Sequence, residues 1–248
     1  MIEVRNLKKN FGPNPVLNGV SFGIEKGESL VIIGRSGSGK SVLLKHLIGL
    51  LKPDAGQVLI EGEDITGMNE RELLRVRNRF GMVFQGAALF DSMNVAENVG
   101  FAFRRDRRLT EKEITRKVSE SLEMVDLPGI EYKNPSELSG GMRKRVGLAR
   151  AIVYEPEIVL YDEPTTGLDP IVSDSIDQLM MRVRDRLRVT TVVVTHDMRT
   201  ARRLGQRILM LHDKTIYATG TPEDIFGSQD PVVKQFIDGI SDERYLQS

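Results

Sequence analysis

A single stretch decides the fold: Leu30-Val31-Ile32-Ile33-Gly34-Arg35-Ser36-Gly37-Ser38-Gly39-Lys40-Ser41. Its apolar beginning is typical of a strand that is buried on both faces of a parallel sheet. The continuation fits the pattern G-x-x-x-x-G-K-S, and a helix is expected from Lys40 onward. The glycines let the chain curl so that backbone N–H groups point at one phosphate, beside the positive N-terminus of the helix. The stretch therefore predicts a phosphate-binding loop in an α/β fold.

Within this loop, Lys40 is expected to reach the β- and γ-phosphates of a nucleotide, and Ser41 is expected to coordinate Mg²⁺. The alternative is a glycine-rich turn that binds nothing, and the strand and helix on either side argue against it. The residues of this segment expected to contact ATP are Gly34, Arg35, Ser36, Gly37, Ser38, Gly39, Lys40, Ser41 and Val42.

Further apolar runs predict strands, and helical stretches alternate with them, as in α/β folds. The predicted strands are Ser29–Ile33, Gln57–Ile60, Gly81–Phe84, Ile158–Tyr161, Thr190–Thr195 and Arg207–Leu211. The predicted helices are Ser41–Gly49, Glu70–Arg77, Ser173–Arg188 and Arg199–Leu204.

The segment from Gln85 to Tyr154 differs, because helical patterns dominate it and strand signals are few. Apolar residues recur at helical spacing over Glu111–Met124. Another helix is expected after Ser139, through Arg143 to Val153. We interpret the segment as a helical subdomain that is inserted into the α/β core.

The composition excludes several classes of protein. The chain has 248 residues, with 35 Lys and Arg, 35 Asp and Glu, and no Cys. A net charge of zero gives no basic field for nucleic acid or an anionic membrane surface, and the lack of Cys excludes disulfides and thiolate metal sites. Met1–Asn6 reads as a strand and not as a signal peptide, and no run approaches the ~18 apolar residues that cross a bilayer. If the protein serves a membrane, another chain has to cross it.

A second motif places two carboxylates at the end of the apolar strand Ile158–Tyr161. Asp162 is expected to hold Mg²⁺ through water, and Glu163 is expected to polarise the attacking water. By itself, a strand that ends in Asp-Glu is more often a solvated strand end. The phosphate-binding loop earlier in the chain favours the catalytic interpretation.

A third motif, Leu138-Ser139-Gly140-Gly141-Met142, precedes a helix that carries Arg143, Lys144 and Arg145. One interpretation is a serine N-cap followed by glycines. The other is a second phosphate cradle, in which the Ser139 hydroxyl and glycine N–H groups bind a γ-phosphate. One chain does not need two cradles for one ATP, so this interpretation implies that each nucleotide lies between two chains.

These motifs occur in the order found in nucleotide-binding subunits of ABC transporters, which the chain resembles over essentially its whole length. Residues 34–41 resemble Walker A, Gln85 the Q-loop glutamine, residues 138–142 the LSGGQ signature, residues 158–163 Walker B, residues 167–170 the D-loop, and His196 the H-loop histidine. The resemblance implies an α/β P-loop NTPase (RecA-like) core with a mostly parallel sheet, an N-terminal antiparallel β-subdomain and an inserted α-helical subdomain. The implied borders are 1–85 and 156–236 for the core with its β-subdomain, 86–155 for the helical subdomain and 237–248 for a C-terminal tail.

The resemblance also implies roles for single residues. Gln85 would touch Mg²⁺ or the water and report the nucleotide state to the helical subdomain. His196 would hydrogen-bond the γ-phosphate. Asp169 would lie at the seam of a homodimer, and Phe11 would stack on adenine. The implied catalytic residues are Glu163, His196, Gln85 and Lys40; the implied Mg²⁺ ligands are Ser41, Gln85 and Asp162; and the partner chain would contribute its Ser139, Gly140 and Gly141 to the bound ATP.

A finer resemblance is to the Mla-type lipid transporters and their Mce-linked relatives. It rests on Phe84–Val99, on Asp230–Gly239, and on Met142, which stands where the wider family usually has Gln. The change at Met142 puts any side-chain contact from that position in doubt. Residues 84–99 lie where such ATPases form the groove for the coupling helix of the permease.

This finer resemblance implies a complex at the cytoplasmic face of the inner membrane. Its members would be a homodimer of this chain, an integral membrane permease (MlaE-like), an Mce-domain substrate-binding protein and a small cytoplasmic regulatory subunit, with phospholipid as cargo and no nucleic acid. A tail that reaches across the dimer or onto a small partner is a further hypothesis, and a frayed terminus is the alternative. Two other classes stay open: the ATPase of an amino-acid or lipoprotein transporter, and an ABC ATPase that does not transport.

Overall fold

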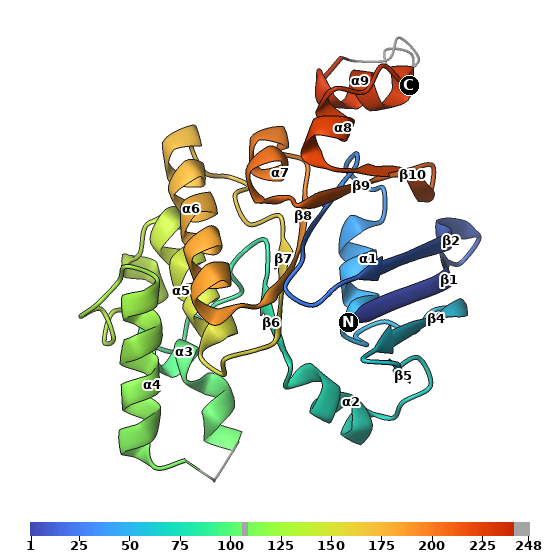
Figure 1. The fold of residues 1–248 in the computed structure, drawn as a ribbon. Coiled ribbons are helices and arrows are strands. Elements are labelled where there is room, and N and C mark those ends of the chain that lie inside the picture. The colour runs from blue at the N-terminus through green and yellow to red at the C-terminus, as the bar shows by residue number, and fades with distance from the viewer. Residues whose placement is uncertain (106–108, 241–248) are drawn as a thin grey trace. The chain divides into compact units, whose positions relative to one another are not determined.

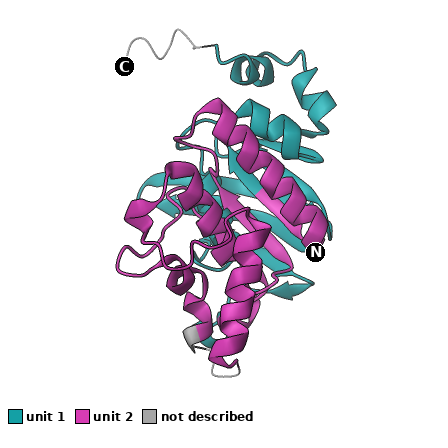
Figure 2. Cartoon of the chain, turned by 90° about the vertical axis from the view of Figure 1, so that its left-hand side faces the viewer, with its two compact units in different colours: residues 1–73, 193–248 teal, residues 74–192 magenta. Residues whose placement is uncertain are grey.

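A computed structural model describes residues 1–105 and 109–240, and the chain forms two compact units (Figures 1 and 2). The first unit comprises residues 1–73 and 193–248, and the second comprises residues 74–192. From residue 241 onward, the predicted tail lies outside the described residues. Of the helices in the described part of the chain, none has both the length and the apolar character that crossing a membrane requires.

An antiparallel sheet in the first unit contains the N-terminal strands (Figure 1). Its strand order is β2-β1-β4-β5, with β1 at Ile2–Phe11, β2 at Asn14–Ile24, β4 at Ala55–Ile60 and β5 at Glu63–Asp64. Burial alternates along β1, so Ile2 and Val4 face the core while Glu3 and Arg5 face solvent. The sheet matches the expected β-subdomain, although the sequence had indicated strands only over the first six residues and over Gln57–Ile60.

The first unit also holds the strand that precedes the phosphate-binding loop. Strand β3 (Ser29–Ile33) is buried along its whole length and pairs in parallel with β9 (Arg207–His212). Strand β10 (Thr215–Gly220) follows and pairs antiparallel with β9. Helix α1 (Lys40–Leu47) follows the loop, and α7 (Met198–Leu204) packs on β3. The predicted strand at 29–33 is confirmed with identical bounds.

Two short helices close the described part of the first unit. They are α8 (Pro222–Phe226) and α9 (Pro231–Ile237). Each begins with a side-chain N-cap, Thr221 and Asp230 respectively, followed by Pro at the first helical position. Neither helix was predicted, because each is too short to show an apolar period.

The second unit combines two parallel strands with a group of helices. Strand β6 (Phe80–Val83) pairs in parallel with β7 (Ile158–Asp162). The helices are α3 (Val95–Val99), η1 (Phe101–Arg105), α4 (Glu111–Met124), η2 (Pro135–Glu137), α5 (Gly140–Ile152) and α6 (Pro170–Leu187). Helix α5 is central, since it packs against α3, α4, α6 and β6. The predicted helix at 111–124 is confirmed with identical bounds.

Two elements run across the border between the units, α2 (Glu70–Arg77) and β8 (Thr190–Thr195), and both have the bounds predicted from the sequence. Helix α6 begins three residues before the predicted start at Ser173. The reason is that Asp169 caps this helix and Pro170 occupies its first turn.

Candidate functional site

The loop between β3 and α1 needs glycine at two of its positions. Gly34 has a φ of 156°, and a Cβ added there would lie 2.5 Å from the carbonyl oxygen of Leu211. Gly39 has a φ of 99°, and a Cβ there would lie 3.0–3.1 Å from atoms of Val16 and Leu17. Any larger residue at either position would push the loop away from β9 or β2. The loop is therefore held close to the neighbouring strands of its own unit.

Three features of this loop suit a bound phosphate. Lys40 is only 6% exposed, and its Nζ donates to the carbonyl oxygens of Gly34 at 2.8 Å and Arg35 at 3.2 Å. Helix α1 begins after Gly39 without a side-chain cap. The Oγ atom of Ser38 is buried and has no hydrogen-bond partner among the described residues. An ammonium, a helix N-terminus and a hydroxyl are the donors that phosphate oxygens accept from.

Phe11 and His196 also belong to the first unit, at the ends of two strands. Phe11 ends β1 with 47% of its surface exposed, and Lys9 Nζ lies 5.7 Å from its ring centroid. His196 follows β8 and is exposed. The turn that carries it is fixed, because the N–H of Asp197 donates to Thr195 Oγ1 at 3.0 Å and Asp197 caps α7. An exposed aromatic face suits stacking on a base, and an exposed imidazole suits a phosphate.

In the second unit, β7 leads directly into the two predicted carboxylates. Asp162 and Glu163 are each only 8% exposed. Glu163 has a φ of 49°, a conformation that a residue with a side chain rarely adopts and that concentrates at functional sites. Thr166 Oγ1 donates to Glu163 Oε2 at 3.2 Å, which fixes the direction of the carboxylate. The pair is therefore buried and oriented, unlike an ordinary solvated strand end.

The Ser-Gly-Gly loop packs against the beginning of α6. Ser139 is exposed, and its Oγ accepts from the N–H of Met142 at 3.2 Å, so it caps α5. A Cβ at Gly141 would lie 2.8 Å from Val172 Cγ1, so this glycine allows the close contact. The cap uses the backbone of Met142, and the departure from Gln therefore leaves it intact. Both interpretations of this motif remain compatible, because a capping serine still presents lone pairs to solvent.

Asp169, which was predicted to lie at a dimer interface, has a structural role within its own chain. Its Oδ1 accepts from the N–H groups of Ile171 and Val172, each at 3.0 Å, and so caps α6. The neighbouring Ile171 is 81% exposed, which is unusual for so large an apolar side chain. The cap positions the exposed isoleucine beside the glycine loop of the same unit.

Gln85 leaves β6 and is exposed, while the backbone of the loop that it begins is held by two basic residues that were not predicted to be functional. Lys144 Nζ donates to the carbonyl oxygen of Gln85. Arg150 donates to the carbonyl oxygens of Ala87 at 2.7 Å and Ala88 at 2.6 Å. Burial lowers the pKa of Lys144, and Glu163 partly opposes this effect. The signal that could have indicated a role for Lys144 and Arg150 is the presence of basic residues on α5, a helix that is largely buried.

The predicted Mg²⁺ ligands offer a hydroxyl, an amide and a carboxylate, and oxygen atoms of these kinds are the ligands that Mg²⁺ prefers. Gln85 and Asp162 belong to the second unit and Ser41 to the first. Within residues 1–105 and 109–240, no cluster of three or more His, Cys, Asp or Glu residues could hold a metal ion by itself.

Comparison with known proteins agrees with the local chemistry. The ABC transporter family matches residues 17–166. The chain is 44% identical to the probable ribonucleotide transport ATP-binding protein mkl of Mycobacterium leprae, over 96% of this chain and 69% of the relative. It is 40% identical to the intermembrane phospholipid transport system ATP-binding protein MlaF of Haemophilus influenzae, over 98% of this chain and 92% of the relative.

A solved structure gives the same result. The dimeric post-hydrolysis state of the ATP-binding cassette MJ0796, bound to ADP and Pi, is 33% identical to this chain with a TM-score of 0.82. The similarity covers 90% of this chain and 99% of the cassette. The expected α/β P-loop NTPase fold and the expected ATPase activity are thereby confirmed. With its glycine loop, buried carboxylates and serine-capped helix in the expected order, the chain belongs to the ABC transporter family of ATPases.

Proposed function

We propose that this chain is the ATP-hydrolysing subunit of a transporter that moves phospholipid through a separate permease. The observation that carries this proposal is the 40% identity to a phospholipid-transport ATPase over 98% of this chain and 92% of the relative. A match over nearly the whole of both chains extends beyond the ATP motifs, which supports a common role for the two proteins.

The proposed chemistry divides the work among the residues described above. The loop between β3 and α1 binds the phosphates, and Phe11 stacks on the adenine. The residues of this loop and the start of α1 that contact the nucleotide are Gly34, Arg35, Ser36, Gly37, Ser38, Gly39, Lys40, Ser41 and Val42. Ser41, Gln85 and Asp162 would hold Mg²⁺, which would supply positive charge to neutralise the phosphates. Glu163 orients the attacking water and accepts its proton, and Thr166 keeps the carboxylate in position. His196 stabilises charge on the γ-phosphate.

The second phosphate cradle supports a homodimer, in which Ser139, Gly140 and Gly141 of one chain complete the ATP site of the other. Asp169 and the exposed Ile171 would lie at the seam, because burial of so large an apolar surface favours association. The domain borders predicted from the sequence, 1–85 with 156–236, 86–155 and 237–248, remain part of this proposal.

The permease is proposed to dock on residues 84–99. Phe90 is 42% exposed there, and its ring centroid lies 4.7 Å from that of Phe101. The loop beneath is rigid because the fully buried Asn98 bonds to the backbone of Phe90 and Met93. The complex would include an Mce-domain protein and a small regulatory subunit, with this chain at the cytoplasmic face of the inner membrane.

The ATPase part of the proposal is tested with Glu163→Gln. This variant keeps the shape and the acceptor for Thr166 but cannot take a proton, so it is expected to bind ATP and Mg²⁺ and to remain a dimer in gel filtration. The wild-type protein under the same conditions serves as the control. Turnover at the wild-type rate would overturn the assignment of Glu163.

The cargo is tested with the whole membrane complex, purified through this chain and reconstituted into vesicles. ATP-dependent movement of a fluorescent phospholipid, absent with Glu163→Gln, is the expected result. Movement of a ribonucleotide instead would overturn the lipid proposal and favour the activity in the name of the mycobacterial relative. Movement of an amino acid or a lipoprotein would likewise overturn it.

A further inference from the structure

Helix α5 holds the loop that follows β6 through two basic side chains, and all of these residues lie in the second unit. Lys144 Nζ donates to the carbonyl oxygen of Gln85. Arg150 Nη2 donates to Ala87 O at 2.7 Å and Arg150 Nη1 to Ala88 O at 2.6 Å. Three of the four carbonyl oxygens of residues 85–88 thus accept hydrogen bonds from cationic side chains of one helix. Hydrogen bonds from charged donors are stronger than those between neutral groups.

Between the two basic residues, the helix touches the loop directly. A Cβ added at Gly147 would lie 3.2 Å from Ala87 Cβ, and Ala87 is only 1% exposed. Positions 144, 147 and 150 are spaced so that they fall along one face of the helix. The loop therefore contacts α5 over two successive turns. The contacts are the hydrogen bond from Lys144, the close approach at Gly147 and the two hydrogen bonds from Arg150 to neighbouring carbonyl oxygens.

The conformation of the loop requires this support. Ala87 has a φ of 60° and Ala88 a φ of 49°, a region that alanine rarely enters. Two consecutive residues in this region persist only where their surroundings fix them. Lys144 is only 8% exposed, and burial lowers the pKa of both Lys144 and Arg150. Buried cations of this kind need acceptors, and the carbonyl oxygens of the loop provide them.

Lys144 also interacts with the proposed catalytic base. Its positive charge is attracted to the carboxylate of Glu163, which is itself only 8% exposed. Lys144 also lines a small cavity with Tyr161 and Pro164, which flank Asp162 and Glu163 in the sequence, so the ammonium that bonds the backbone of Gln85 lies close to the proposed catalytic carboxylates. The helix that carries it begins at the cap residue Ser139, five positions before Lys144.

We infer that Lys144, Gly147 and Arg150 are positioning residues that hold the loop of Gln85 in register with Glu163 and with Ser139. They act through Gln85, Glu163 and Ser139, the residues that are proposed to contact the nucleotide and the attacking water. Because loop and helix are bonded at several points, a displacement of Gln85 moves Ser139 with it. This inference rests on the proposed roles of Gln85 and Glu163, and it goes beyond them by naming what couples the two.

The experiment compares Lys144→Met and Lys144→Arg with the matched control Lys117→Met. Lys117 belongs to the same unit, but its side chain pairs with Glu155 at the surface, at 2.8 Å. Two quantities are measured: amide hydrogen exchange of residues 84–90 in the protein without nucleotide, and kcat and KM for ATP hydrolysis. Thermal unfolding shows whether each variant is folded.

Lys144→Met is expected to exchange faster over residues 84–90 and to lose roughly tenfold in kcat, the factor that corresponds to one charge-assisted bond. KM for ATP is expected to change less than kcat, because the phosphate-binding loop is untouched. Lys144→Arg is expected to restore both quantities, and Lys117→Met to leave both at the wild-type values. If Lys144 had a purely structural role, its replacement would speed hydrogen exchange and slow turnover without this dependence on a cation at position 144.

Two results would overturn the inference: exchange and kcat of Lys144→Met at the wild-type values, or no restoration by Lys144→Arg in a folded protein. If Lys144→Met fails to fold, Lys144→Gln decides, since it keeps a donor and removes the charge. Exchange of Lys144→Gln equal to that of Lys144→Arg would then overturn the inference, and faster exchange would support it. Because exchange is measured without nucleotide, failure of the proposed function would appear in Glu163→Gln and not here.

Discussion

Arg35 Nη2 donates to Gln235 Oε1 at 3.2 Å, a contact between residues that lie 200 positions apart in the chain. The bond joins the phosphate-binding loop to α9 in the first unit. Helix α9 is anchored by Val233, which is only 2% exposed, and by Asp230, which accepts from the hydroxyl of Tyr217 at 3.1 Å. The end of the described chain therefore contacts the loop that binds phosphate, and α9 is part of the ATP-binding unit.

The first prediction concerns this contact. Gln235→Ala removes the acceptor for the Arg35 guanidinium and is expected to lower the free energy of unfolding by about 1 kcal/mol, the usual value for one hydrogen bond. Faster hydrogen exchange over residues 231–237 should accompany the loss, because α9 then keeps fewer contacts. Urea denaturation and exchange mass spectrometry measure the two effects.

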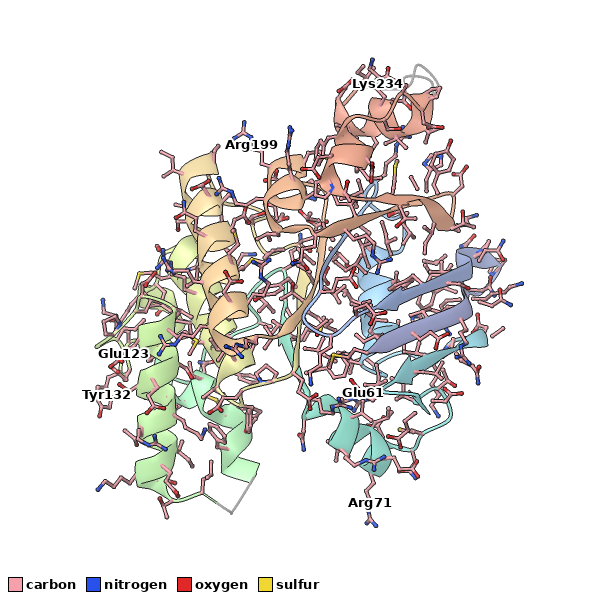
Figure 3. The ribbon with its side chains drawn as sticks, in the orientation of Figure 1. Glu61, Arg71, Glu123, Tyr132, Arg199 and Lys234 are labelled. Carbon is pink, nitrogen blue, oxygen red and sulfur yellow. The ribbon has the colours of Figure 1, made fainter. Side chains whose placement is uncertain are left out.

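Lys234→Ala is the matched control, since Lys234 lies on the same helix and is exposed (Figure 3). It should change stability by no more than the ~0.5 kcal/mol typical of surface substitutions. Equal exchange rates for the two variants would show that Gln235 does not tether α9.

The second prediction separates two roles of Asp169. Asp169→Ala removes the N-cap of α6 and is expected to cost about 1 kcal/mol of stability. Asp169→Asn keeps an acceptor for the N–H groups of Ile171 and Val172, so its stability should stay near that of the wild type. Thermal unfolding of both variants tests the cap.

Asp169→Ala and Asp169→Asn also test whether Asp169 lies at the proposed dimer interface. If Asp169 contributes its charge at a dimer interface, Asp169→Asn should lose ATPase activity while it keeps its stability. An active and stable Asp169→Asn, beside a destabilised Asp169→Ala, would assign the residue to capping alone.

The third prediction concerns Asn98, the fully buried residue beneath the proposed permease-docking loop. Its Oδ1 accepts from Phe90 N at 2.7 Å, and its Nδ2 donates to the carbonyl oxygens of Phe90, Met93 and Asn94 at 3.0, 2.9 and 3.1 Å. Asn98→Ala removes all four of these bonds, although Phe90 O keeps the donor Met93 N and Asn94 O keeps the donor Asn98 N, and it is expected to cost about 3 kcal/mol.

Asn98→Asp provides the sharper comparison, although it changes the side chain less. A carboxylate cannot donate, so it would place negative charge against the carbonyl oxygens that the amide now serves. We expect it to destabilise the protein at neutral pH at least as much as Asn98→Ala does, as measured by urea denaturation. A stability near the wild type would contradict the bonding described for Asn98.

Some elements were predictable because their signals are local. The apolar run of β3 and the glycines of the following loop specify strand, loop and helix within a dozen residues, and α4 shows its period within a single segment. Helix α6 was predicted to begin too late, although Asp169-Pro170 is a helix-start signal, because apolar spacing was used to set its start. Local signals therefore predicted that a helix or strand is present more reliably than they predicted where it begins and ends.

The contacts made by Lys144 and Gln235 could not be predicted in this way. Their partners lie 59 and 200 positions away in the sequence, and spacing along the chain does not tell which distant carbonyl or guanidinium a side chain will meet. The positive φ of Glu163 was also hidden, since nothing in the pattern of a strand followed by Asp-Glu distinguishes a strained end from a relaxed one. The carboxylates were identified by residue type, and their burial and orientation came from the fold.

The fourth prediction concerns His46 on α1, which is only 1% exposed. Burial lowers its pKa, and the charge of Lys9 lowers it further, while the bond between Nδ1 and Val42 O at 2.7 Å and the charge of Asp54 oppose this. Below the ordinary histidine pKa of about 6.5, the unfolded chain therefore binds a proton that the folded protein does not. The contribution of His46 to stability is complete above that pH and is lost as the pH falls toward the folded pKa.

His46→Asn isolates this effect, because its amide can still donate to Val42 O but does not titrate. The free energy of unfolding, measured in urea between about pH 7 and pH 5, should fall with decreasing pH more steeply for the wild type than for His46→Asn. The other titratable groups are present in both proteins, so the difference in slope belongs to His46. Equal slopes would mean that the imidazole is protonated as readily in the folded protein as in the unfolded chain, and hence that its burial in the last turn of α1 carries no penalty.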